Sequence, residues 1–339
     1  MRLAIYGAGA MGTILGAYLA KSGENIDLIS RNEAHIEGLK NYGAHIIGKI
    51  DFTQKVNALL PQDMAGKYDI IFLMTKQMDN LAVVKGLTNY LASDGVICTM
   101  QNGLPELSVA KVIGENRTIG CAMAWGATMI GKGIVELTSE ASRETLSFSL
   151  GTLGSQADKH FFKVVKLLEI MGDVKVEDNF IGARWAKLLV NSAFSGLSAV
   201  LGATFGEIAT NKKSRVFVQK IAKECIEVTK KAKIRIEPIQ GKDLVKLLDY
   251  NGPIKKKISF MIIPLAIKKH RLLKSSMLQD LEKGRRCEIE AINGVVCASG
   301  DKVNLETPVN DRIVKIVHEI ENGKYKSRWQ NLELFKDLL

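Results

Sequence analysis

The sequence has few cysteines, few aromatic residues and no long hydrophobic run. Its five cysteines are scattered and no two form a C-x-x-C pair, so zinc and redox motifs of this kind are not expected. We interpret the cysteines as reduced, mostly buried side chains, and we expect no metal site. Aromatic residues make up only 6% of the chain. That leaves little for base stacking, and since no nucleic-acid motif is found, we expect no nucleic-acid partner.

Membrane segments are also missing. No apolar run reaches the roughly 18–20 residues that a membrane-spanning helix needs. The longest candidate, Ile258–Ile267, is short, contains Pro264 and is flanked by lysines. The N-terminus does not resemble a signal peptide, because only a few apolar residues precede the first glycine. We therefore expect a cytoplasmic protein with no membrane partner.

The composition is that of a folded protein, with 46% hydrophobic and 24% charged residues. A length of 339 residues suits two domains. The formal net charge of +11 is unevenly divided: residues 1–180 carry −2 and residues 181–339 carry +13. This asymmetry favours two domains with different electrostatic roles, and the basic half could attract small anions.

The first half alternates strand-like and helix-like segments. Apolar runs predict strands at 3–6, 25–30, 69–74 and 96–100, and helical spacing predicts helices at 11–21 and about 79–91. Strand then helix, repeated, indicates a parallel, doubly wound sheet. Residues 118–151 resemble several short strands that could extend the sheet in antiparallel fashion, and a helix is expected at about 158–171.

The second half has no strand pattern. Helices are expected at about 180–201, 213–233, 241–249, 278–298 and 308–322. The sequence thus predicts an α/β protein in which an N-terminal Rossmann domain, residues 1–178, precedes an all-helical C-terminal domain, residues 179–339. We expect the first domain to bind a dinucleotide and the second to carry the substrate and catalytic residues.

A glycine-rich motif, G-x-G-x-x-G, lies between the first predicted strand and the first predicted helix. That is the context of a dinucleotide-binding fingerprint. Its first glycine would make the tight turn, its second would let the backbone approach the pyrophosphate, and its third would let the helix pack on the strand. The candidate cofactor-binding residues here are Gly7, Ala8, Gly9, Ala10, Met11 and Gly12.

The end of the second predicted strand bears on the choice of cofactor. An acidic residue there would bind the ribose hydroxyl of NAD, but this chain has Ser30-Arg31-Asn32. Arg31 can pair with a 2′-phosphate, so NADP(H) is the expected cofactor. Lys76, after the third strand of the pattern, could help to hold the phosphate or the adenosine end, although it could equally be a solvated loop lysine.

Two further segments carry polar residues suited to chemistry. Gln101-Asn102 ends a strand at the same edge and would face the nicotinamide, although Asn-Gly is also a common turn pair. Lys187, Asn191 and Ser195 recur at intervals of four on an otherwise apolar helix and share one face. A lysine there must reach solvent or face a polar cleft, and the adjacent Asn and Ser favour a cleft.

These motifs, in this order and spacing, resemble the ketopantoate reductase (2-dehydropantoate 2-reductase) family over nearly the whole chain. The resemblance rests on the glycine motif with Arg31 after the second strand, on Asn102-Gly103, and on Gly126-Ala-Thr128 with Gly131-Lys-Gly133. It also rests on W-x-K-L-x-x-N at 185–191 and on S-S-M-x-Q-D, R-R and E-I-x-x-I-N-G within 275–294.

The resemblance implies a Rossmann domain and a helical domain like the C-terminal domain of 6-phosphogluconate dehydrogenase, with the active site in the cleft between them. It implies that Lys187 is the catalytic general acid and Glu288 its carboxylate partner. It further implies NADPH-dependent reduction of a small anionic 2-oxo acid, ketopantoate, to pantoate in pantothenate biosynthesis. The substrate-binding residues would be Asn102, Asn191, Ser195 and Ser276.

Two features depart from the family pattern. Ser195 stands where the family often has Asn or Asp, and residues 249–273 look longer and more basic than the usual connection before Ser275. A paralogous NADP-dependent reductase of another 2-oxo acid or of an opine-like substrate therefore remains an alternative. The oligomeric state is also open: a homodimer could use Trp185 or the apolar run 258–267, and both could equally belong to the core.

Overall fold

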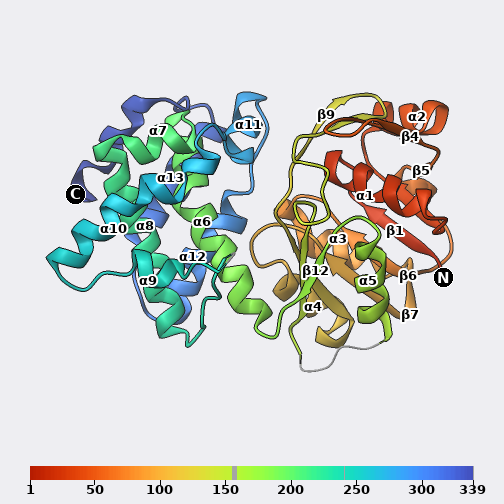
Figure 1. Cartoon of the computed structure of the whole chain (residues 1–339), viewed down its shortest axis with the longest axis horizontal. Helices are drawn as coiled ribbons and strands as arrows, with labels where there is room; N and C mark the ends of the chain where they lie inside the picture. Colours follow the sequence, from red (N-terminus) through yellow and green to blue (C-terminus); the bar gives the residue numbers. More distant parts are fainter. Residues whose placement is uncertain (155–158, 240, 339) are drawn as a thin grey trace. The chain divides into compact units, whose positions relative to one another are not determined.

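The computed structural model describes residues 1–154, 159–239 and 241–338. The chain divides into two compact units, Met1–Phe180 and Ile181–Leu339 (Figure 1). The first is an α/β unit with a mainly parallel sheet and the second is helical. The predicted fold class is therefore confirmed, while the roles expected for domains 1–178 and 179–339 stay predictions.

An eight-stranded sheet forms the centre of the first unit, and β1 lies inside it between β2 and β6. The strand order reverses at β1, which in doubly wound sheets is where ligands bind. β11 pairs antiparallel with β8, so the expected antiparallel extension is present. In sheet order the strands are β12 (Val174–Val176), β11 (Phe148–Thr152), β8 (Thr118–Met123), β7 (Leu91–Thr99), β6 (Tyr68–Leu73), β1 (Leu3–Tyr6), β2 (Ile26–Ile29) and β5 (Asn57–Leu59).

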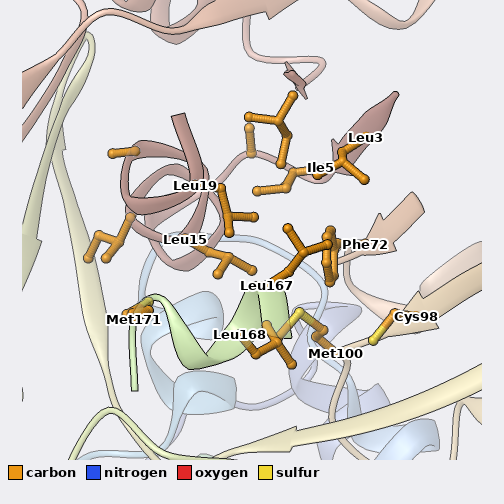
Figure 2. Close-up of a cluster of buried hydrophobic side chains, with 14 of the residues drawn as sticks. Leu3, Ile5, Leu15, Leu19, Phe72, Cys98, Met100, Leu167, Leu168 and Met171 are labelled. Atoms are coloured by element: carbon orange, nitrogen blue, oxygen red, sulfur yellow. The ribbon is translucent and has the colours of Figure 1, made fainter. Parts of the chain in front are cut away.

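Successive side chains of the central strands enter two different cores. Leu3 and Ile5 of β1 pack with α1 (Ala10–Lys21) and α5 (Lys159–Glu169), as Figure 2 shows. Ala4 faces the other way, into a core shared with α3 (Asn80–Leu87) and α4 (Glu106–Ile113). Burial on both faces explains why these strands are continuous apolar runs in the sequence.

A second, four-stranded sheet was not expected from the sequence. Its strands, in order, are β4 (Phe52–Gln54), β3 (Ala44–Gly48), β10 (Ile134–Leu137) and β9 (Ala127–Gly131). β3 follows α2 (Glu33–Tyr42), and β10 pairs parallel with it although the two are far apart in the sequence. A Cβ on Gly38 would lie 2.4 Å from the carbonyl carbon of Lys132, so glycine there lets α2 approach the β9–β10 turn closely.

The second unit is built from helices, and within the described residues none is long and apolar enough to span a membrane. α6 occupies Phe180–Leu201, the range expected for it. The others are α7 (Phe205–Thr210), α8 (Lys212–Lys231), α9 (Leu244–Leu248), α10 (Pro253–Ala266), α11 (Ser276–Glu282), α12 (Ile289–Lys302) and α13 (Pro308–Glu321).

Three sequence expectations were wrong in detail. The single helix expected at 278–298 is two helices. α11 ends at Glu282, and Gly284 just beyond it has φ +65°, the left-handed conformation typical of the residues that follow a helix. The helix expected at 79–91 ends at Leu87, and Leu91 already begins β7. The segment 249–273, expected as a connection, contains α10, which includes Pro264.

The outward face of α10 is apolar. Ser259 and Ile263 are buried on one side, whereas Ile254, Met261 and Leu265 on the other side are 76%, 61% and 72% exposed. Ile258 is exposed on the same face. Residues 253–274, which contain this helix, hold seven Lys or Arg and no Asp or Glu.

Candidate active site

The glycine motif forms a tight loop between β1 and α1. Gly7 has φ +112°, and a Cβ on it would lie 2.5 Å from the backbone nitrogen of Thr75. A Cβ on Gly12 would lie 2.6 Å from the carbonyl oxygen of Gly7. The backbone N–H groups of Gly7 and Ala8 both donate to the carbonyl of Ile29, at 2.9 and 2.8 Å. The loop is therefore fixed to the end of β2 and admits no side chain at its first and last glycines.

Gly9 differs from the other two glycines. A Cβ on it would meet no described atom closer than the Gly7 oxygen at 4.0 Å, and its φ of −83° suits any residue. Packing within the chain therefore does not require glycine here, and the free space beside Gly9 suits a ligand that approaches the backbone. α1 starts at Ala10 with no acidic residue in its first turn, so its N-terminal N–H groups suit a pyrophosphate.

Arg31 lies at the end of β2, beside this loop. It is exposed, and Asn32 next to it caps α2 by accepting a hydrogen bond from the N–H of His35 at 3.2 Å. Burial raises the pKa of Tyr6, at the end of β1, and the guanidinium of Arg31 acts on it in the opposite direction. Arg31 thus lies within electrostatic reach of the carboxyl end of β1.

The loops that carry Lys76 and Asn102 are tied together by two glutamines. Gln101 is buried, donates to the carbonyl of Thr75 at 2.8 Å and to Oδ1 of Asn80 at 2.9 Å, and accepts from Thr99. Gln77 donates from its side chain to the carbonyl of Asn102. These bonds hold Gln101 in place between the two loops, and its expected orientation towards a nicotinamide stays a prediction. Asn102 is half-buried and Lys76 is exposed.

A buried histidine links α1, the helix that follows the glycine loop, to the turn between β9 and β10. His35 of α2 makes a 2.9 Å hydrogen bond between Nε2 and Oγ1 of Thr13, and its Nδ1 accepts from the N–H of Gly133 at 3.2 Å. Because Nδ1 is an acceptor, Nε2 carries the proton and the ring is neutral. Burial lowers the pKa of His35 accordingly. No local motif in the sequence marks His35 as a residue of this region.

In the second unit, α6 presents one partly exposed stripe. Lys187, Val190, Asn191 and Ser195 are half-buried, whereas the other side chains from Arg184 to Val200 are buried. The three polar residues singled out from the spacing therefore share the face of α6 that solvent and ligands can reach. An ammonium, an amide and a hydroxyl in a row suit an anionic, oxygen-rich substrate. Trp185 is buried, in agreement with the alternative that it belongs to the core rather than to a dimer contact.

The other two predicted residues begin helices. Ser276 is the exposed first residue of α11, and its neighbour Ser275 caps that helix by accepting from the N–H of Leu278 at 3.0 Å. The N–H of Ser275 donates to Oγ of Ser198 at 3.2 Å, which fixes this end of α11 on α6. Glu288 is half-buried and immediately precedes α12.

A buried polar chain fixes α12 on α6. Asn293 donates to the carbonyl of Ser192 at 3.1 Å and to Oδ1 of Asn310 at 2.9 Å. The Nδ2 of Asn310 donates to Glu224 at 2.7 Å. A Cβ on Gly196 would lie 2.5 Å from Oδ1 of Asn293, so glycine permits this contact. The I-N-G motif at 292–294 therefore positions helices, which its sequence alone did not reveal.

Comparison with known proteins identifies the family to which this chain belongs. The family model for ketopantoate reductase PanE/ApbA matches residues 3–147, and the model for the C-terminal part of that family matches residues 179–321. This chain belongs to the ketopantoate reductase family. The 2-dehydropantoate 2-reductase of Pyrococcus horikoshii is 31% identical over 314 residues, with 91% of this chain and 94% of the relative covered. That of Lactococcus lactis is 26% identical, with 95% and 98% covered.

Solved structures share the fold of this ketopantoate reductase family member. A D-mandelate dehydrogenase in a ternary complex with NADH and anilino(oxo)acetate superposes with a TM-score of 0.81 at 25% identity, covering 95% of this chain and 99% of that protein. A family member from Ralstonia eutropha superposes with a TM-score of 0.80 at 23% identity, covering 96% and 99%. The chain is thus an oxidoreductase of a family whose structural relatives include an NADH-binding enzyme.

Proposed function

We propose that this chain reduces 2-dehydropantoate (ketopantoate) to (R)-pantoate with NADPH, a reaction of pantothenate and coenzyme A biosynthesis. The observation that carries the proposal is the stripe Lys187, Asn191 and Ser195, the accessible polar face of a helix that is otherwise buried. Family membership supports it, and so do the curated relatives, which are themselves 2-dehydropantoate 2-reductases.

The residues of the first unit fit the cofactor. The free space at Gly9 and the N-terminus of α1 would take the pyrophosphate, and Arg31 would pair with the 2′-phosphate. Lys76 would add a second positive charge, and Asn102 would lie towards the nicotinamide end. We propose NADPH rather than NADH because β2 is followed by Ser30-Arg31-Asn32, which offers no carboxylate to a ribose 2′-hydroxyl. Bound NADPH would supply the hydride.

Lys187 acts at the carbonyl oxygen of the substrate in this proposal. Negative charge develops on that oxygen during reduction, and the ammonium of Lys187 stabilises the charge and donates the proton. Burial disfavours an ammonium, whereas a carboxylate partner favours it. Glu288 is proposed as that partner. Asn102, Asn191, Ser195 and Ser276 would hold the carboxylate and hydroxyl groups of the substrate.

A second candidate function is reduction of a different 2-oxo acid. The structural match to D-mandelate dehydrogenase, bound to NADH and anilino(oxo)acetate, favours it. The hydroxyl of Ser195 is shorter than an Asn side chain and would leave more room along the α6 stripe. In this case Lys187 and Glu288 keep their roles and the difference lies in the residues that hold the substrate.

The test is steady-state oxidation of NADPH and, in parallel, NADH, with ketopantoate and a panel of other 2-oxo acids including phenylglyoxylate. We expect the kcat/KM for ketopantoate with NADPH to exceed that of every other pair of substrate and cofactor by at least about tenfold. A higher value with phenylglyoxylate would move the function to the second candidate. Equal use of both cofactors would contradict the role of Arg31.

A further inference from the structure

The segment that carries Glu288 is bound to α13 on both sides of that residue. On its N-terminal side, the backbone N–H of Cys287 donates to Oε1 of Glu321 at 2.9 Å. On its C-terminal side, Oε1 of Glu290 lies 2.6 Å from Nε2 of His318. Glu321 and His318 are themselves joined, since Oε2 of Glu321 lies 3.0 Å from Nδ1 of His318. One chain of hydrogen bonds therefore brackets Glu288.

The protonation of this chain follows from its partners. Both nitrogens of His318 face carboxylate oxygens, which accept but do not donate when ionised. The form that satisfies both bonds is the imidazolium, with a proton on each nitrogen. Burial opposes that charge, but the bonds to Glu290 and Glu321 outweigh it and raise the pKa of His318. Burial likewise opposes ionisation of Glu321, but the Cys287 N–H and His318 outweigh it and lower its pKa.

The two bonds differ in their exposure. The side chain of Glu321 is 4% exposed, whereas that of Glu290 is 67% exposed. The bond from Glu321 to the backbone is thus the better protected from solvent and salt, and it acts one residue from Glu288. Other titratable groups near the cluster include the thiol of Cys287, whose pKa burial raises to about 12, and Asp280 of α11, which acts on that thiol.

From this geometry we infer that Glu321 and His318 are positioning residues that hold Glu288 in place for the 2-oxo acid substrate. The inference rests on the proposed function, because the role of Glu288 is taken from that proposal. It adds a pH dependence: the imidazolium is present below the raised pKa of His318 and is lost as the pH rises through it. A neutral ring can donate to only one of the two carboxylates, so one bond of the chain is lost there and the hold on the segment weakens with it.

The experiment compares the wild-type enzyme with Glu321→Ala, Glu321→Gln and His318→Gln. Glu319→Gln is the matched control, since Glu319 lies on the same helix and pairs with Lys324 at 2.7 Å, away from the segment. Glu321→Ala should raise the KM for the 2-oxo acid about tenfold or more, the size of effect expected for a lost hydrogen bond to a charged group. The KM for NADPH should stay within about twofold. Glu321→Gln keeps an oxygen for the Cys287 N–H and should recover most of the loss.

His318→Gln tests the pH dependence. In the wild type the KM for the 2-oxo acid should rise as the pH passes from about 6 to about 9, and in His318→Gln this rise should be absent. Glu319→Gln should keep both the KM and the rise. Hydrogen exchange at the amide of Cys287 gives a second readout, and it should speed up in Glu321→Ala but not in Glu319→Gln. If Glu321→Ala fails to fold, Glu321→Gln and His318→Gln carry the test.

Several results would overturn the inference. One is an unchanged KM and pH profile in Glu321→Ala and His318→Gln while the wild type is active, which would leave the proposed function standing. Another is an equal loss for substrate and NADPH, which would indicate a general structural defect. If the wild type reduces no 2-oxo acid, the proposed function fails first and the inference fails with it.

Discussion

The candidate binding groups of the first unit belong mostly to the backbone, whereas those of the second are side chains. Around the glycine loop, three glycines leave room for a ligand and for close packing, and the donors are N–H groups at the start of α1. On α6, by contrast, Lys187, Asn191 and Ser195 project from an ordinary helix whose backbone groups are already paired. The two units also differ in net charge, near neutral against strongly basic.

This difference shows how the candidate binding groups of each unit can be altered. A backbone site is changed by adding atoms where none fit, so the sensitive positions are glycines. A side-chain site is changed by removing the functional group, so the sensitive positions are polar residues on the accessible stripe. Substitutions in the first unit should therefore act on cofactor binding or stability, and those in the second on turnover and substrate binding.

The largest effect is expected at Lys187. Lys187→Ala should lower kcat by about 10²–10⁴-fold, because the proton donor to the carbonyl oxygen is lost. The KM for NADPH should change little, since the proposed cofactor residues lie in the other unit. Steady-state kinetics at saturating NADPH measures this. Lys302→Ala, at an exposed lysine of α12, is the control for lost charge. A Lys187→Ala enzyme with near-full kcat would show that this residue is not the acid.

Two glycine substitutions separate packing from cofactor binding. Gly9→Ala should leave the melting temperature unchanged but weaken NADPH about ten- to a hundredfold, because the methyl group occupies ligand space and disturbs charge-assisted hydrogen bonds. Gly12→Ala should instead lower the free energy of unfolding by about 1–3 kcal/mol, because its methyl group meets the Gly7 carbonyl. Thermal melting and fluorescence titration with NADPH distinguish them. The backbone interpretation is refuted if Gly9→Ala binds NADPH normally.

Arg31 should determine the preference for NADPH over NADH without affecting the rate of hydride or proton transfer. Arg31→Ala should raise the KM for NADPH about tenfold through loss of the 2′-phosphate contact, and it should leave NADH use nearly unchanged. Lys40→Ala, at an exposed lysine near the other end of α2, controls for the change in net charge. Parallel kinetics with the two cofactors is the measurement. Equal losses with both would argue against the phosphate contact.

The smallest effect is a pH dependence of stability in the first unit. The pKa of His35 is lowered in the folded state, so the unfolded chain takes up the proton first as the pH falls below about 6.5. Stability is therefore lost on acidification in that range. Melting curves between about pH 7 and pH 5 should show the loss, and His35→Gln should reduce it. His45→Gln, at a histidine paired with Asp51 on a more exposed surface, should not.

The elements with strong local signals were predicted well from the sequence. β1 and α6 occupy the expected residues, and α1 begins one residue before the expected start, because apolar runs and helical spacing decide them locally. The second sheet was missed because β3 and β10 pair across a long stretch of chain and each has only one well-buried face. α10 was not predicted, and its Pro264 lies near the end of the helix, where a proline disrupts little.

The site followed the same rule. The glycine-loop residues were predicted from a local motif, Lys76 and Asn102 from their places at strand ends, and the α6 stripe from regular spacing. Gln101, His35, Asn293 and Glu321 were not assigned their roles, because each acts through a partner distant in sequence. Gln101 pairs with Asn80, and Glu321 with the backbone of Cys287. Such partners cannot be read from spacing within one segment.

The apolar outer face of α10 has a consequence for handling the protein. Its exposed Ile254, Met261 and Leu265 sit in a segment with seven cations and no acid. At low ionic strength these cations repel the same segment of another molecule. Added salt screens that repulsion, and salts such as sulfate also strengthen apolar association. This face therefore favours storage of the protein in dilute buffer, where the cations keep the molecules apart. Added salt should promote self-association through the apolar side chains.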